Sequence, residues 1–242
     1  MTDFTTRKLA PDLVLDARRA VFLSETKTLV VADLHLGYVW AHRHGGNLLP
    51  LSASDDSLPR LMNLVESYAP REMVLLGDIV HRAVPVAELK RELRESLCAL
   101  GERVELRLVA GNHDRRLAPL LAECGVATDL LREMECGPHL LTHGDGADMS
   151  RANAQRAAAS ARGGRVLIGH EHPAITISDQ VATTAKVPCF LVGERVLMLP
   201  AFSAWAAGSN VRVGRWMSPF AQGEPFPLAL AILAGKLLPV RL

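Results

Sequence analysis

Five short apolar runs, each ending at polar side chains, constrain the fold of this chain more than any other feature. They lie at residues 29–35, 73–78, 106–114, 140–145 and 166–172, with the sequences LVVADLH, MVLLGD, LRLVAGNHD, LLTHGD and VLIGHEH. Continuous apolar runs of this length are typical of strands buried on both faces. In open α/β sheets, ligands bind beyond the carboxyl ends of such strands. These five strand-end motifs therefore predict that their polar residues meet at one site.

The polar ends of the motifs are rich in metal-binding side chains. The candidate ligands are Asp33, His35, Asp78, Asn112, His143, His170 and His172. Oxygen and imidazole ligands without thiolates suit Mn²⁺, Fe or Zn²⁺. Two such ions about 3.5–4 Å apart can bind both free oxygens of a phosphoryl group and lower the pKa of a water molecule. An ordinary polar turn would explain any one motif, but it does not explain the whole series.

The rest of the chain predicts an α/β fold. Residues 12–23 predict a strand hairpin, and helices are expected from Ser54–Asp56 to Pro70, from Pro85 to Leu100, and at about 115–122 and 151–161. From Pro173 the pattern changes to short strands at 174–178, 187–192, 195–199 and 228–234, with a tight turn at Gly193 and Glu194. This order predicts two packed mixed β-sheets flanked by helices. We expect one domain over residues 1–242, with a motif core at 29–172 and a strand-rich part at 173–242.

Composition limits the class of protein. The net charge of +1 gives no strong global field for nucleic acid or a membrane, although a local basic groove remains compatible with it. Four cysteines without a CxxC pair predict isolated buried thiols in a reducing compartment. The charged N-terminus does not resemble a signal peptide, and the most apolar stretch, 227–240, is too short to span a bilayer. We therefore expect a cytoplasmic protein without a membrane partner.

The motif series resembles that of the calcineurin-like metallophosphoesterases. The matching motifs are Asp33-x-His35, Gly77-Asp78, Gly111-Asn112-His113-Asp114, His143 and Gly169-His170-x-His172. The resemblance implies a four-layer α/β/β/α sandwich with two divalent ions. It implies that the first ion is bound by Asp33, His35, Asp78 and His172. It implies that Asp78 bridges to the second ion, whose other ligands are Asn112, His143 and His170. It also implies that His113 protonates the leaving oxygen and that Asp114 orients His113.

A narrower resemblance concerns one branch of that family. The segments LHLG (34–37) followed by Pro50, GHEHP (169–173), VPCFLV (187–192) and LPAFSAWAAG (199–208) are similar to the branch whose bacterial members are associated with DNA ligase. Archaeal members share the last segment. The resemblance implies phosphodiester cleavage in DNA or RNA during DNA repair, with Mn²⁺ the most expected ion. A DNA ligase or helicase partner and a homodimer are further expectations.

Two loops after the motifs are expected to contact the substrate. His81 stands where the family commonly has Asp, and it is predicted to line the pocket. Arg82 is predicted to clamp phosphate oxygens, because a guanidinium binds two oxygens at once. Arg43, between His42 and His44, is a third candidate. The alternative for Arg82 is a surface arginine at the start of the next helix.

The aromatic residues of the C-terminal part have two interpretations. Phe202, Trp205, Trp216, Phe220 and Phe226, with Arg212 and Arg215 among them, predict either a base-stacking surface or a hydrophobic lid or dimer contact.

Three functions remain open at this point. The leading hypothesis is a two-metal phosphodiesterase acting on nucleic acid. The second is a phosphatase or pyrophosphatase acting on a small nucleotide or a lipid-linked diphosphate. The third is a non-catalytic scaffold, and the filled ligand positions argue against it.

Overall fold

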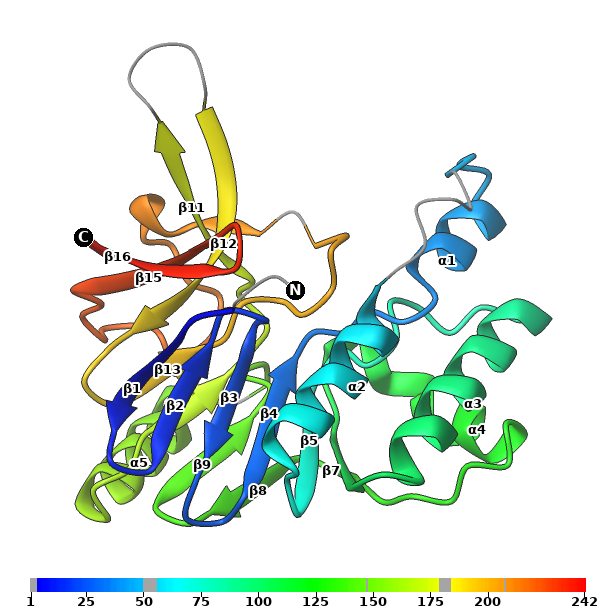
Figure 1. Cartoon of the computed structure of the whole chain (residues 1–242), viewed down its shortest axis with the longest axis horizontal. Helices are drawn as coiled ribbons and strands as arrows, with labels where there is room; N and C mark the ends of the chain where they lie inside the picture. The colour runs from blue at the N-terminus through cyan, green and yellow to red at the C-terminus, as the bar shows by residue number, and fades with distance from the viewer. Residues whose placement is uncertain (1–3, 50–55, 147, 179–183, 207) are drawn as a thin grey trace.

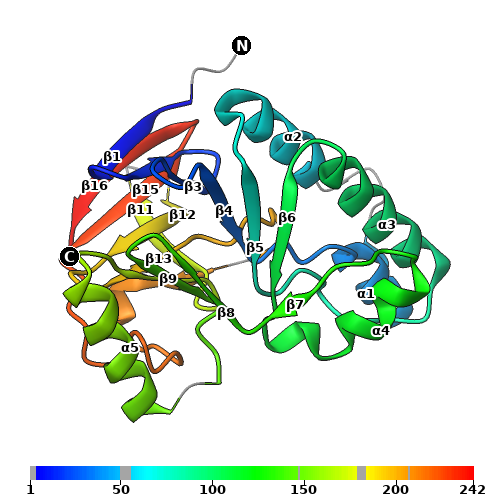
Figure 2. The same cartoon turned by 90° about the horizontal axis from the view of Figure 1, so that it is seen from below.

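Two mixed β-sheets lie face to face between two layers of helices (Figures 1 and 2). This computed structural model describes residues 4–49, 56–146, 148–178, 184–206 and 208–242. Helix α5 covers the outer face of one sheet, and helices α2, α3 and α4 cover the outer face of the other (Figure 2). The predicted α/β class with two packed mixed sheets and flanking helices is confirmed.

The first sheet follows the order of the chain. Its strands are β1 (Thr6–Ala10), β2 (Leu13–Asp16), β3 (Ala20–Leu23), β4 (Thr28–Ala32), β5 (Glu72–Leu76), β6 (Glu105–Val109) and β7 (Leu130–Leu131). Strands β1 to β4 pair antiparallel, whereas β4 to β7 pair parallel. The carboxyl ends of β4, β5 and β6 therefore lie along one edge of this sheet.

The second sheet has a more complex order. Its main path is β14 (Ser209–Asn210), β11 (Pro173–Ser178), β12 (Thr184–Val192), β13 (Val196–Met198), β10 (Val166–Ile168), β9 (His139–Thr142) and β8 (Glu133–Cys136). Strand β15 (Leu228–Leu233) pairs with β12, and β16 (Lys236–Arg241) pairs with β15. Because β9 and β10 are parallel, their carboxyl ends also share an edge.

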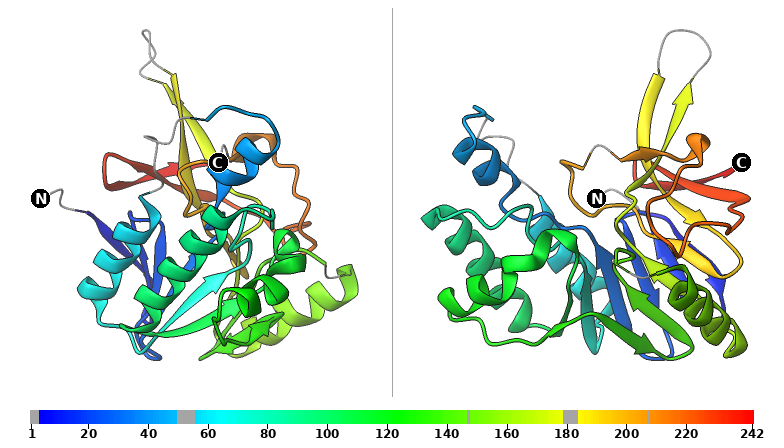
Figure 3. Two further views of the ribbon diagram at one scale, coloured as in Figure 1. Left: turned by 90° about the vertical axis from the view of Figure 1, so that its right-hand side faces the viewer. Right: turned by 180° about the vertical axis from the view of Figure 1, so that it is seen from behind.

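The helices are α1 (Tyr38–His44), α2 (Ser57–Tyr68), α3 (Ala87–Gly101), α4 (Leu117–Glu123) and α5 (Met149–Ala161), with 3₁₀ turns η1 (Asn112–Arg116) and η2 (Val211–Val213). Helix α1 follows β4 closely and rises on the same side of the molecule as strands β11 and β12 (Figures 1 and 3). Within the described residues, no helix combines the length and apolar character needed to cross a bilayer.

Alternation along the central strands creates the separate cores. In β4, Leu29 and Val31 pack against the helices, whereas Val30 and Ala32 pack between the two sheets. Side chains of a strand point alternately to its two faces, so a strand covered on both faces has a nearly continuous apolar run. The same rule explains the continuous run of β5, whose residues are all buried.

Several predicted boundaries are wrong in detail. The loop expected after His35 contains helix α1, whose one buried residue is Ala41, so it has no apolar stripe for a sequence pattern to detect. Helix α2 ends at Tyr68, two residues before Pro70, and predicted start residues Ser54 and Asp55 lie outside the described residues. Pro85 is not the first helical residue, because Val86 is extended and α3 begins at Ala87.

The aromatic residues of the C-terminal part do not form one surface. Phe202 and Phe220 are fully buried in two different cores. Trp216 and Phe226 contact each other edge to face at a ring distance of 5.8 Å, against the core beneath α5. Trp205 stacks on Tyr38 instead. The prediction of a shared surface for all five residues is wrong, because the chain turns them toward separate layers.

Candidate metal centre

The five strand-end motifs converge. Asp33 and His35 follow β4, Asp78 follows β5, Asn112 and His113 follow β6, His143 follows β9, and His170 and His172 follow β10. Residues from the first sheet thus meet residues from the second. An isolated parallel bridge between Ala32 and Ala201 and the hydrogen bond from Ser203 N to the Asp33 carbonyl join the segments here.

One group of four side chains resembles a metal site in geometry. Asp33, His35, Asp78 and His172 each offer a ligand atom, and these atoms all lie within 4.8 Å of one another. The Nε2 atoms of His35 and His172 are 3.3 Å apart, and Nε2 of His172 is 3.4 Å from Oδ1 of Asp33. This is the set that the resemblance implied for the first ion.

A second group surrounds His143. Its Nε2 lies 3.1 Å from Oδ1 of Asn112 and 3.4 Å from Oδ1 of Asp78. The ring of His170 contacts the His143 ring edge to face at 5.0 Å. Asp78 therefore contacts the second group while belonging to the first. This is the position that a bridging carboxylate requires.

Unpaired nitrogens show that the residues fit a metal. In the part of the chain that the structure describes, Nδ1 of His35 and Nδ1 of His143 are buried and have no hydrogen-bond partner. Buried polar atoms are normally paired, so an orphaned imidazole nitrogen calls for a ligand. Together with two buried carboxylates, the imidazoles form an oxygen and nitrogen donor set that suits divalent cations.

Backbone strain also concentrates here. Nine described residues other than glycine have positive φ angles, and five of these are predicted ligands: Asp33 (56°), His35 (49°), Asp78 (46°), His170 (66°) and His172 (45°). The left-handed region is uncommon for residues with a Cβ atom, and such strain clusters at functional sites. The strand-end turns use this conformation to aim their side chains inward.

Two glycines make room for the ligands. A Cβ atom on Gly77 would collide with the ring of His143, and one on Gly111 would collide with the carboxylate and backbone nitrogen of Asp78. Gly77 has in addition a φ of 74°. The glycines that precede Asp78 and Asn112 in the motifs are therefore needed for close packing around Asp78.

Asp114 has a different role from the one predicted. Its buried carboxylate accepts hydrogen bonds from the backbone nitrogens of Ile79 (3.1 Å), Val80 (3.1 Å) and Gly111 (2.9 Å). It thereby fixes the turn after β5 against the turn after β6. Orientation of His113 by the Asp114 side chain is not what the structure shows, because the His113 ring has another partner.

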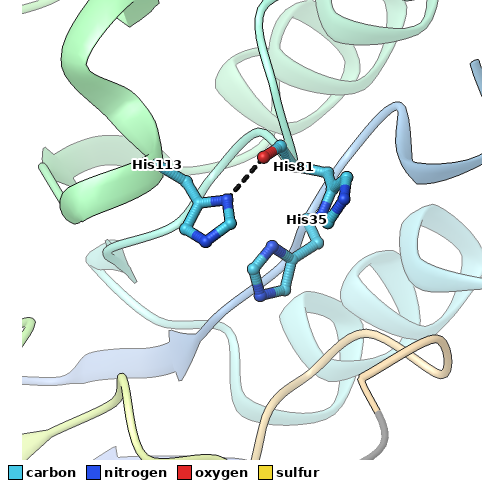
Figure 4. Close-up of side chains that lie close together, drawn as sticks. All are labelled: His35, His81 and His113. Atoms are coloured by element: carbon cyan, nitrogen blue, oxygen red, sulfur yellow. Dashed lines mark hydrogen bonds between the residues drawn. The ribbon is translucent and has the colours of Figure 1, made fainter. Parts of the chain in front are cut away.

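That partner is the backbone of His81. Nδ1 of His113 lies 2.5 Å from the carbonyl oxygen of His81 (Figure 4). The rings of His35, His81 and His113 lie close together (Figure 4), and each offers a nitrogen within 4.8 Å of the others. Nε2 of the half-exposed His113 is 3.8 Å from Oδ2 of Asp78. His81, predicted to line the pocket, does lie beside the candidate centre.

Burial and charge set the protonation of the cluster. Burial lowers the pKa of His35 to about 4, so its ring is neutral near pH 7 and offers a lone pair. Burial opposes charge on His143 as well, but Asp78 and Asp33 outweigh it and raise the pKa of His143 to about 9. Burial also opposes charge on Asp78, yet hydrogen bonding to His143 lowers its pKa overall. A divalent cation would compete with the proton that these groups share.

The two predicted arginines lie near helix α1. Arg82 donates to the carbonyl oxygen of Ala41 (3.0 Å), and Arg43 donates to the carbonyl oxygen of Leu49 (2.8 Å). Both side chains hold backbone in the 38–49 segment, and both remain exposed. Their predicted contact with substrate stays a prediction.

Glu171 was not singled out by the sequence. It is buried between the two histidines of its motif, and its carboxylate accepts a hydrogen bond from the backbone nitrogen of Ser218 (2.5 Å). The hydroxyl of Ser218 in turn donates to the carbonyl oxygen of Gly144. This network braces the turn that carries His170 and His172. An acidic residue between two ligand histidines was the available signal.

Comparison with known proteins agrees with this geometry. Residues 26–184 match the family described as calcineurin-like phosphoesterase. The nuclease MPE of Pseudomonas putida has a similar structure, with a TM-score of 0.64 and 21% identity over 98% of this chain and 100% of that chain. Yfce, a phosphoesterase from E. coli, has a TM-score of 0.41 and 13% identity over 88% of this chain and 98% of that chain. No curated protein matches. The likeness to nuclease MPE shows a shared fold.

Proposed function

Because the chain belongs to the calcineurin-like phosphoesterase family, whose match covers residues 26–184, we propose that it is a two-metal phosphodiesterase acting on nucleic acid. Membership of the family makes it a hydrolase that uses divalent metal ions. One observation carries the finer proposal: Asp78 belongs to the group of Asp33, His35 and His172, and its Oδ1 also lies 3.4 Å from Nε2 of His143. Nε2 of His113 lies 3.8 Å from the other carboxylate oxygen of Asp78.

In this proposal each group of donors holds one ion. Asp33, His35, Asp78 and His172 bind the first, and Asn112, His143, His170 and the shared Asp78 bind the second. Two divalent ions, which we propose to be Mn²⁺, supply Lewis acidity at the phosphoryl oxygens and lower the pKa of the attacking water. The protein supplies a rigid cluster, since the strained turns and the Asp114 and Glu171 carboxylates hold the donors in place.

We propose His113 as the general acid. Its Nδ1–H donates to the carbonyl oxygen of His81, so in the protonated ring Nε2 carries the transferable proton. That nitrogen lies 3.8 Å from Oδ2 of Asp78, and the His113 side chain is half-exposed, so a leaving oxygen can reach the ring. Proton transfer to the leaving oxygen prevents an alkoxide from accumulating as the P–O bond breaks.

The choice of nucleic acid rests on two supports. The similar structure named nuclease MPE belongs to a nuclease, and the branch motifs resemble DNA-ligase-associated phosphoesterases. In this proposal the exposed side chains of Arg43 and Arg82 contact phosphates of the strand. A role in DNA repair beside a ligase or helicase is part of the same proposal.

A substrate panel tests it. After EDTA treatment we expect no hydrolysis, and after addition of Mn²⁺ we expect cleavage of single-stranded DNA and of bis-p-nitrophenyl phosphate. Cyclic nucleotides, nucleoside diphosphate conjugates and p-nitrophenyl phosphate complete the panel. Activity on monoesters or diphosphates alone would favour the phosphatase or pyrophosphatase hypothesis. A metal-loaded protein inert on every substrate would favour the scaffold, and activity in chelator would contradict the metal mechanism.

A further inference from the structure

A row of rings leads outward from the candidate metal centre. The His81 ring lies 5.4 Å from the His35 ring and 5.5 Å from the His113 ring, measured between centroids. Tyr38 lies 4.5 Å from His81, and Trp205 stacks on Tyr38 at 5.3 Å with an interplanar angle of 7°. We call His81, Tyr38 and Trp205 the aromatic row. It starts beside the predicted general acid and ends at a tryptophan from a distant segment of the chain.

The backbone fixes this row to the centre. Tyr38 lies three residues after His35, and the backbone nitrogen of His81 donates to the carbonyl oxygen of Leu36 (3.0 Å). Leu36 and Val80 also form an isolated parallel bridge. The segment that carries Tyr38 is therefore joined directly to the segment that carries Asp78 and His81. A group that touches Tyr38 is only two ring contacts away from His35.

Tyr38 and Trp205 also form one wall of a cavity of about 380 Å³. We call it the aromatic cavity. It lies among α1, α2 and α3, with Leu36, Trp40 and Leu58 as further apolar walls. Binding sites for small ligands begin at about 300 Å³ and combine apolar walls with a few polar groups. The aromatic cavity meets both conditions.

The charge of the lining restricts the occupant. Glu88, Glu92 and Glu95 lie along the cavity, and Arg91 is the one basic residue among its lining residues in the described chain. The carboxylate of Glu92 accepts hydrogen bonds from Gly37 N (2.8 Å) and Trp40 Nε1 (2.6 Å), which makes that wall rigid. An acidic lining repels phosphate, but carboxylates accept hydrogen bonds from the N–H groups of bases, including the ring N–H of thymine. A flat ring that carries N–H donors and no negative charge fits this lining.

We propose that the aromatic cavity binds the nucleobase adjacent to the scissile phosphate, which packs against the stacked pair of Tyr38 and Trp205. This inference rests on the proposed phosphodiesterase function, and it adds the chemical class that the substrate must carry. A nucleic-acid strand and a small nucleotide diester both supply such a base, since both tether a base to a phosphodiester. A base that enters the cavity leaves its stack, so an unpaired strand is favoured over a duplex.

Two diesters with the same leaving group test the inference. They are thymidine 5′-(p-nitrophenyl phosphate), which carries a base, and methyl p-nitrophenyl phosphate, which does not. For the Mn²⁺-loaded wild type we expect a higher kcat/KM with the thymidine diester. Trp205→Ala and Tyr38→Ala should each reduce that advantage by about 5- to 150-fold, the range for loss of one stacking ring. The loss should fall on KM, and kcat/KM for the methyl diester should stay within about twofold.

Controls separate stacking from folding. Trp205→Phe and Tyr38→Phe keep a ring and should retain most of the advantage. Phe4→Ala removes an exposed ring that contacts Arg18 instead, and it should leave the advantage intact. An unchanged ratio in folded Trp205→Ala and Tyr38→Ala would overturn the inference while the phosphodiesterase function stands. A wild type inactive on both diesters would overturn the phosphodiesterase function instead.

A binding measurement gives a readout other than activity. Two of the three tryptophans, Trp40 and Trp205, line the cavity, so a stacked base should quench intrinsic fluorescence. We expect thymidine monophosphate to quench the wild type and to quench Trp205→Ala less, whereas deoxyribose 5-phosphate should quench neither. Equal quenching of both proteins would contradict the inference. Comparison of single-stranded oligonucleotides with cyclic nucleotides then decides which source of the base is preferred.

Discussion

Nε2 of His35 and Nε2 of His172 lie 3.3 Å apart, although the two residues follow strands of different sheets. His35 follows β4 of the first sheet, and His172 follows β10 of the second. Two imidazole nitrogens at this distance can share a single proton, or both can bind one cation. The cluster exists only when the two sheets are packed together. Metal binding and sheet packing should therefore be coupled.

That coupling predicts a metal-dependent stability. Mn²⁺ at about 100 times its dissociation constant should raise the free energy of unfolding by about 2.7 kcal/mol per site, because it binds the folded chain alone. Thermal unfolding followed by circular dichroism measures the shift. His172→Ala should lose most of the gain at the first site, whereas His44→Ala, exposed on α1, should keep it. A melting temperature that does not change when Mn²⁺ is added would contradict the coupling.

His113 should affect chemistry and not metal binding. His113→Ala should keep both ions but lower kcat by about 10²–10⁴-fold on a diester with a poor, alkoxide-like leaving group. On a p-nitrophenyl leaving group, which needs no proton, the loss should be much smaller. Paired kinetics on the two substrates measure the difference. An equal loss on both would assign His113 a structural role instead.

Gly77 should tolerate no side chain. Gly77→Ala places a Cβ atom against the His143 ring at a residue with a φ of 74°. Gly125→Ala is the matched control, because its φ is 71° and its Cβ would meet nothing within 4 Å. The control should cost about 1–2 kcal/mol from backbone strain alone. Gly77→Ala should cost about 1–3 kcal/mol more, from overpacking.

Denaturant unfolding of the two alanine variants measures this difference. Gly77→Ala should also weaken Mn²⁺ binding, because the collision displaces a proposed ligand. Equal free energies of unfolding for the two variants would show that His143 can move aside without cost.

Away from the centre, the buried pair of Asp16 and Arg18 should dominate local stability. Arg18 binds both carboxylate oxygens of Asp16 at 2.9 and 2.6 Å, and it also donates to Asn63 and Ser67 of α2. Asp16→Asn leaves a buried guanidinium without its counter-charge and should cost about 3–5 kcal/mol. Glu105→Gln, at a half-exposed pair with Arg107, should cost no more than about 1 kcal/mol. Similar unfolding midpoints for the two variants would contradict this ranking.

The central strands could be predicted because burial on both faces requires a run of consecutive apolar residues, which is visible in the sequence. Strands β4 and β5 are covered on both faces, so every position after their first residues, Thr28 and Glu72, is apolar, and the run stops where the site begins. The sequence thus placed candidate ligands at the carboxyl ends of neighbouring strands, and the structure brings them together. Their roles as metal ligands remain predictions.

Features set by distant contacts could not be predicted. The Asp114 carboxylate accepts hydrogen bonds from the backbone nitrogens of Ile79 and Val80 across 35 and 34 positions, and no local pattern marks such a bond. Tyr38 and Trp205 stack although 167 positions separate them, and neither apolar periodicity nor motif spacing connects them. Phe202, three residues before Trp205, is instead fully buried. Whether an aromatic residue of this segment is buried therefore depends on the path of the chain and not on the residue type.

Anomalous diffraction from crystals grown with Mn²⁺ tests the two-metal centre most directly. We predict two manganese peaks about 3.5–4 Å apart, with the Asp78 carboxylate between them. The first should lie among Asp33, His35 and His172, and the second among Asn112, His143 and His170. Crystals of Asp78→Asn should show neither peak at full occupancy, whereas Asp129→Asn, exposed and outside the cluster, should show both. No peak or a single peak at Asp78 in the wild type, or two full peaks in Asp78→Asn, would contradict a bridged two-metal centre.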